Sequence, residues 1–183
     1  MVSTETGQAQ VDYLAERNVV VAVDLGGHGE SGLGRADWNL AAFGDDVLAV
    51  VEEVGAQKVA LVGHSMGGDA IVHAARQLGD RVAGLVWIDA FRSLGNEPES
   101  TPEQIEAFLA PFRADFAAAV AALTYITAPI VAINPDIQPT DVESMRRHGV
   151  EPVVLTNVGH FLMIEDPEQF NPILAGTLAS FGG

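Results

Sequence analysis

The chain has 183 residues, of which 48% are hydrophobic, and this suits one globular domain with a substantial core. Its formal charge of −16 would repel nucleic-acid phosphates and anionic membrane surfaces, so we expect a small-molecule partner, no nucleic acid and no membrane. The absence of cysteine excludes disulfides, thiol nucleophiles and thiolate metal sites.

The first ten residues, MVSTETGQAQ, lack the basic end and apolar centre of a signal peptide. No apolar run approaches the roughly 20 residues that a membrane-spanning helix needs. These features predict a soluble, cytoplasmic protein.

Short apolar runs alternate with longer segments of helical periodicity, which predicts an α/β fold with a mostly parallel sheet of about five strands and helices on both faces. The predicted strands are Asn18–Val23, Lys58–Gly63, Ala83–Ile88, Pro129–Ile133 and Pro152–Thr156. The predicted helices are Gln8–Arg17, Leu40–Val54, Met66–Leu78 and Pro167–Phe181, with an Ala-rich helical insertion at Thr101–Leu123 that Pro111 divides.

The loop after the first predicted strand, DLGGHGESG, contains G-x-G-x-x-G at Gly27, Gly29 and Gly32. A dinucleotide site needs the last glycine to open a helix, and an acidic residue at the end of the next strand. Here Gly32 is followed by another loop, and the next strand ends in Gly63. The pattern therefore favours a tight turn, with nucleotide binding as a third-ranked alternative and no cofactor expected.

A stronger motif follows the second predicted strand, where Gly63-His-Ser-Met-Gly67 reads G-x-S-x-G and leads into a helix. In this context a sharp turn raises the hydroxyl of Ser65 above the strand ends, and the helix N-terminus can stabilise an oxyanion. Ser65 is the candidate nucleophile, and the N–H of Met66 is a candidate oxyanion donor.

A serine nucleophile needs a general base, and His160 lies between the last predicted strand and the last helix, at the same edge of the sheet as Ser65. We interpret His64, His73 and His148 as packing or surface residues. The histidines and aspartates show no metal-ligand spacing, so no metal is expected.

The segment Asp24–Ser31, the turn at Gly63–Gly67, and Val158–Phe161 with Glu165-Asp-Pro167 together resemble motifs of the α/β-hydrolase superfamily, in particular its small esterase-like and dehalogenase-like members. Gly26 stands where the family's D-x-R-G-x-G-x-S loop has arginine. The resemblance implies a truncated α/β-hydrolase fold in one domain over residues 1–183, with a short helical lid at 92–126.

The same resemblance leaves two positions for the acid that orients His160. Asp89 ends a strand in Trp-Ile-Asp-Ala-Phe-Arg92, which is similar to the acid-bearing segment of one dehalogenase subgroup, and we favour it modestly. Asp136 follows the next strand and is the alternative.

Relatives begin with further strands and a loop that gives a second oxyanion donor, and this sequence lacks both. The second donor is sought in the backbone of Gly26 and Gly27. Either Asn18–Val23 pairs directly with the next strand, or a second copy covers the open sheet as a homodimer, or the sequence is part of a longer chain.

The resemblance implies a serine hydrolase that cleaves small or medium carboxylic esters through an acyl-enzyme. The alternative is a non-catalytic, hydrolase-like binding protein or inactive fragment. The expected substrate pocket is formed by His28, Phe91, Leu94 and Phe161.

Overall fold

The computed structural model describes residues 4–91 and 123–182 of the chain. The lid expected at 92–126, except for its last four residues, and the pocket residue Leu94 lie outside this part. No helix in the described ranges is both long enough and apolar enough to span a bilayer.

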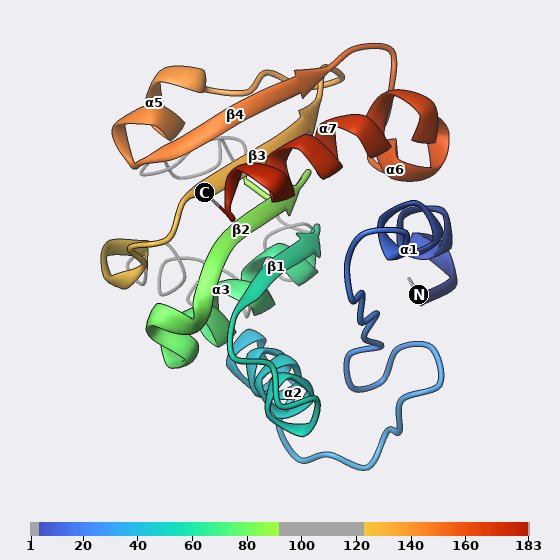
Figure 1. The fold of residues 1–183 in the computed structure, drawn as a ribbon, viewed down its shortest axis with the longest axis vertical. Helices are drawn as coiled ribbons and strands as arrows, with labels where there is room; N and C mark the ends of the chain where they lie inside the picture. Colours follow the sequence, from blue (N-terminus) through green and yellow to red (C-terminus); the bar gives the residue numbers. More distant parts are fainter. Residues whose placement is uncertain (1–3, 92–122, 183) are drawn as a thin grey trace, which may run out of the picture.

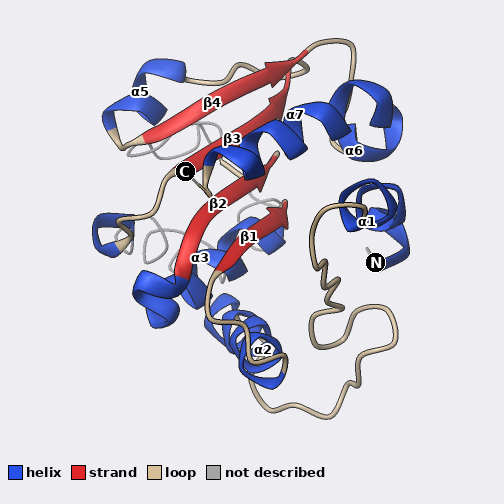
Figure 2. Ribbon diagram, viewed as in Figure 1, coloured by secondary structure: helices blue, strands red, loops and turns tan. Residues whose placement is uncertain are grey.

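Four parallel strands form the sheet, in the order β1-β2-β3-β4, and they point the same way (Figures 1 and 2). Their bounds are Val59–His64, Val82–Ile88, Ile130–Pro135 and Val150–Leu155. The ends of each strand lie within two residues of those predicted. The parallel α/β architecture is confirmed.

Helices connect and cover these strands. They are α1 (Gln8–Ala15), α2 (Leu40–Glu53), α3 (Met66–Leu78), α5 (Val142–Arg147), α6 (Leu162–Glu165) and α7 (Pro167–Ser180). Short 3₁₀ turns occupy Thr4–Gly7 (η1), Gly79–Arg81 (η2) and Leu123–Tyr125 (η3).

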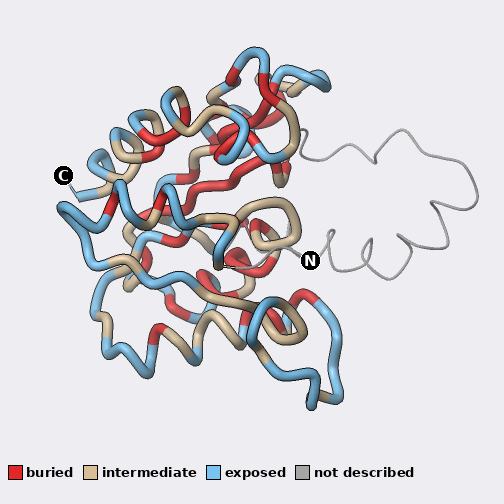
Figure 3. Tube along the Cα trace, turned by 90° about the vertical axis from the view of Figure 1, so that its right-hand side faces the viewer, coloured by how far each residue is buried: buried red, intermediate tan, exposed pale blue. Residues whose placement is uncertain are grey.

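The two larger clusters of the core lie on opposite faces of the sheet, because alternate strand residues point to opposite sides. Leu85 and Trp87 of β2 pack with residues of α2, α3 and α5 on one face. Val86 and Ile88 pack with α1, α6 and α7 on the other face, which gives three layers. Figure 3 shows the buried positions concentrated along the strands and the inner sides of the helices.

The first predicted strand, Asn18–Val23, is wrong: this segment is a loop. A strand needs hydrogen bonds to a neighbour, and among the described strands β1 pairs with β2 alone, so its other edge is open. Direct pairing of the segment with β1 is therefore also wrong. Val19 is 93% exposed, and Val62 on the open edge of β1 is 39% exposed.

Candidate active site

The turn that carries Ser65 joins β1 to α3 at the carboxyl edge of the sheet. Ser65 has a φ of 51°, a left-handed conformation that costs a residue other than glycine free energy. Its N–H donates to the carbonyl of Ile88 at the end of β2, at 2.9 Å. The turn is thereby fixed to the neighbouring strand.

Glycines make this turn sterically feasible. A β-carbon at Gly63 would overlap the backbone of Gly67, and one at Gly68 would overlap the side chain of Ala90. At Gly67, the last residue of the motif, a β-carbon would meet no atom within 4 Å. The first glycine of G-x-S-x-G is therefore required by packing, whereas the second is not.

Asp89 occupies the position after β2 that Ser65 occupies after β1. Its N–H donates to the Ile133 carbonyl of β3 at 2.9 Å, and its φ of 44° is again left-handed. Its side chain is 2% exposed. The strained backbone and the burial together fix the direction in which the carboxylate points.

His160 lies in the loop between β4 and α6, and its Nδ1 is 2.6 Å from Oδ2 of Asp89. The carboxylate accepts from Nδ1–H, so Nε2 of the neutral ring is left as the acceptor. The side chain of His160 is 43% exposed, which leaves it accessible to a ligand. The structure thus brings together His160 and one of the two candidate acids.

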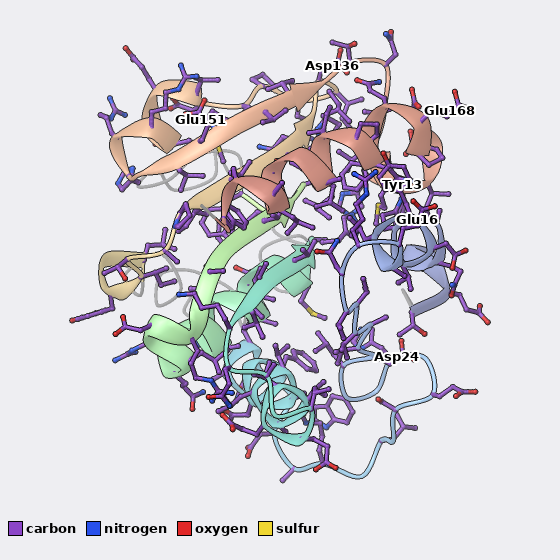
Figure 4. All side chains as sticks on the ribbon, viewed as in Figure 1. Tyr13, Glu16, Asp24, Asp136, Glu151 and Glu168 are labelled. Carbon is purple, nitrogen blue, oxygen red and sulfur yellow. The ribbon has the colours of Figure 1, made fainter. Side chains whose placement is uncertain are left out.

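Asp136 makes a different contact. Its backbone N–H donates to the Leu155 carbonyl at 2.9 Å, but its side chain accepts from the N–H of Asn157 at 3.1 Å. Figure 4 places it at the rim of the sheet beyond β3 and β4. Asp136 is exposed and supports the turn after β4.

His64 has a closer relation to the site than its interpretation as a packing or surface residue implied. Its Nε2 lies 2.8 Å from the backbone carbonyl of His160, and the two ring centroids are 4.5 Å apart. The sequence carried one usable signal, since His64 ends β1 at the edge of the sheet where His160 was expected.

The loop from Asp24 to Gly32 is a tight turn, as the sequence predicted. The carboxylate of Asp24, a residue labelled in Figure 4, accepts hydrogen bonds from two backbone N–H groups. The donors are Thr4, at 2.6 Å, and Glu30, at 3.1 Å. Gly27 and Gly29 have φ values of 78° and 48°, which glycine adopts without strain.

The proposed second oxyanion donors in this loop are engaged elsewhere. The N–H of Gly26 donates to Oδ2 of Asp46 at 2.9 Å, and that of Gly27 donates to the Gly32 carbonyl at 3.1 Å. The assignment of Gly26 and Gly27 as oxyanion donors is therefore corrected, because both hydrogens already have acceptors.

Arg35, which is not at the position where the family's loop motif has its arginine, forms an ion pair beside this loop. Arg35 Nη1 is 2.6 Å from Asp46 Oδ2, and the guanidinium lies where a side chain at Gly26 would otherwise be. Glycine at position 26 thus makes room for Arg35.

The three described residues of the expected substrate pocket have different environments. Phe161 is 38% exposed and lies next to the rings of His64 and His160. His28 contacts its own loop through the Gly26 carbonyl and packs edge-on against Phe43. Phe91 is 2% exposed and packs against Trp87 with the ring centroids 4.1 Å apart, so it belongs to the core, and its assignment to the pocket is corrected.

Two surface hollows in the described part lie away from Ser65. One is at the amino ends of β3 and β4, and the other is between the N-terminal segment and α6. Within the described ranges, no group of three His, Asp or Glu side chains could hold a metal ion.

Comparison with known proteins identifies the fold family of the chain. A family model described as "alpha/beta hydrolase fold" matches residues 6–129, which is more than half of the chain. A bifunctional esterase/perhydrolase from Acinetobacter calcoaceticus is 40% identical over 92 residues, covering 50% of this chain and 33% of the relative. A non-heme haloperoxidase from Rhodococcus erythropolis is 35% identical over 103 residues, covering 55% of this chain and 38% of the relative.

The chain thus spans less than two fifths of the length of these curated relatives. Among solved structures, a thermophilic esterase from Thermogutta terrifontis superposes with a TM-score of 0.72 at 20% identity, covering 98% of this chain and 86% of that one. The enzyme Est816, described as degrading N-acyl homoserine lactones, gives 0.76 at 22% identity, with 96% and 88% covered. The chain belongs to the α/β-hydrolase fold family.

Proposed function

We propose that this protein is a serine hydrolase that cleaves small or medium carboxylic esters through an acyl-enzyme. The observation that carries the proposal is the 2.6 Å contact between Nδ1 of His160 and the buried carboxylate of Asp89, at the sheet edge where the strained turn presents Ser65. A similar protein is named an esterase/perhydrolase, and another is described as a lactone-degrading enzyme, which supports acyl chemistry.

In the proposed reaction, Ser65 Oγ attacks the ester carbonyl while Nε2 of His160 takes its proton. The carboxylate of Asp89 stabilises the resulting imidazolium. Collapse of the tetrahedral intermediate expels the alcohol, which receives the proton from His160. Water, deprotonated by His160, then releases the acid and restores Ser65.

The developing oxyanion is stabilised by the N–H of Met66 and by the N-terminus of α3, whose 13 residues begin at that position. Since the N–H groups of Gly26 and Gly27 have other acceptors, a second donor is not assigned. Loss of one donor lowers the rate of such enzymes by about 10²–10³-fold. The engaged N–H groups of Gly26 and Gly27 therefore favour a second candidate function, that of a binding protein on a hydrolase scaffold.

Fluorophosphonate labelling followed by intact mass spectrometry tests the proposal. We expect one adduct on the native chain, none on Ser65→Ala or His160→Ala, and an unchanged adduct on Ser180→Ala, which removes an exposed serine at the end of α7. Turnover of p-nitrophenyl esters of increasing acyl length then tests the substrate class. A folded chain that forms no adduct and hydrolyses no ester would instead favour the binding protein.

A further inference from the structure

The main chain around His160 is held by two side chains that the proposed reaction does not use. One carboxylate, that of Glu165, accepts from the N–H of Gly159 at 2.6 Å and from the N–H of Phe161 at 3.1 Å. In addition, Nε2 of His64 lies 2.8 Å from the His160 carbonyl. The backbone at His160 is therefore hydrogen-bonded at three points: the N–H of the residue before it, the N–H of the residue after it and its own carbonyl.

The chemistry of the His64 contact defines its polarity. A carbonyl oxygen only accepts, so Nε2 of His64 must carry the hydrogen. Burial lowers the pKa of His64, with a smaller lowering from His160, while the hydrogen bond to the His160 carbonyl and the charge of Asp89 act in the opposite sense. The neutral ring therefore donates a hydrogen bond without placing a second positive charge beside the imidazolium of His160.

These contacts matter because His160 is in a loop and a large part of its side chain is exposed. Proton transfer requires the ring to remain within a few tenths of an ångström of its productive position, and such precision comes from neighbouring hydrogen bonds and packing. The hydrogen bond to Asp89 orients the imidazole ring of His160, but it does not fix the position of the His160 backbone.

We propose that His64 and Glu165 form a positioning clamp on the backbone of His160, which keeps Nδ1 on Asp89 and aims Nε2 at Ser65. This inference rests on the proposed function, since it assigns the clamp to the general base of that reaction. Neither residue touches the reacting atoms in this role.

The test compares two replacements of His64 with one control. His64→Phe keeps an aromatic ring and removes the donor, whereas His64→Gln keeps an N–H donor of similar reach. His148→Phe is the matched control, because Nδ1 of His148 contacts the Ser144 carbonyl at 2.8 Å in α5, away from the site.

We expect His64→Phe to lower the fluorophosphonate labelling rate about tenfold, and to lower kcat for a p-nitrophenyl ester with little change in KM. His64→Gln should restore the rate to within about threefold of the native value. His148→Phe should label at the native rate. If His64→Phe fails to fold, Glu165→Gln, which weakens the other half of the clamp, should show the same loss in kcat.

A second readout does not depend on activity. In the native chain, the Nδ1 proton of His160 in its bond to Asp89 should give a far-downfield NMR signal, assigned by ¹⁵N-histidine labelling and by its loss in His160→Ala. We expect the signal to broaden or disappear in His64→Phe and to return in His64→Gln. Native labelling rates and an unchanged signal in both His64→Phe and Glu165→Gln would overturn the clamp.

The two proposals fail in different ways. If the native chain is not labelled, the proposed function fails, while the NMR signals of His64→Phe and His64→Gln still decide whether the clamp holds His160 against Asp89. If the native chain is labelled and the His64 and Glu165 variants match it, the clamp fails and the proposed function stands.

Discussion

Replacing Asp89 with asparagine should sharply reduce the reactivity of Ser65. The native bond between Asp89 and His160 is short, and the carboxylate is almost entirely buried. Hydrogen bonds to charged groups contribute about 1.5–3 kcal/mol, against about 0.5–1.5 kcal/mol for neutral pairs. If the new amide still accepts through its oxygen, the difference of about 1.5 kcal/mol lowers the rate roughly tenfold.

The loss is larger if the amide turns its NH₂ group toward Nδ1 of His160. The hydrogen of the imidazole must then move to Nε2, which can no longer take the proton of Ser65. A tautomer change of this kind costs about 10⁴-fold in the Ser-His-Asp hydrolases in which it is known. Asp89→Asn is therefore expected to fall between about ten and 10⁴-fold below the native rate.

Asp136→Asn is the matched control, because it makes the same chemical change at the end of the neighbouring strand. Its exposed side chain accepts from the N–H of Asn157 and is away from His160, so we expect a rate within about threefold of the native value. The assay is the second-order rate of phosphonylation by intact mass, with thermal unfolding as the check on folding. A native rate for Asp89→Asn, or a slower rate for Asp136→Asn, would refute the assignment of the acid.

Three further predictions concern stability and assembly. In urea titrations, Gly63→Ala should lower the free energy of unfolding by more than about 3 kcal/mol, because its β-carbon would overlap the backbone of Gly67. Gly67→Ala should change the free energy of unfolding by less than about 1 kcal/mol. Equal effects of the two substitutions would contradict the steric account of the turn. Burial lowers the pKa of His64, so the unfolded chain binds this proton more tightly, and the free energy of unfolding should fall as the pH drops below about 6.5. The variant His64→Gln should lose that part of the slope, and an unchanged slope would argue against the lowered pKa. If two copies pair along the open edge of β1, Val62→Lys should shift sedimentation velocity from dimer to monomer, whereas a monomeric native chain would rule out the predicted homodimer.

The sequence favoured Asp89 only modestly over Asp136, because both aspartates occupy equivalent places at the end of a strand. Ser65, Asp89 and Asp136 each follow a strand, and the N–H of each donates to the end of the next strand in the sheet, at 2.9 Å in every case. Placement at a strand end therefore gives no strong reason to prefer either aspartate. The difference lies in the side chains, since Asp89 is buried against His160 and Asp136 is exposed near Asn157.

Local patterns and motif spacing were sufficient to predict four of the strands, the main helices and the Ser65 turn. Apolar runs, helix periodicity and glycines before a helix act over a few residues, so the sequence displays them directly. The Asn18–Val23 segment shows the limit of such patterns, because its valines favour a strand but only a hydrogen-bonded neighbour can make one.

Contacts between distant segments were decided by the tertiary structure. His64 and His160 are 96 positions apart, and the N–H of Gly26 has its acceptor 20 positions away. Sequence alone therefore determined the α/β architecture and the residue types of the candidate site. The folded chain decided which carboxylate meets His160, which N–H groups are already engaged and which side chains hold the loop, because hydrogen bonds depend on distance and direction in space.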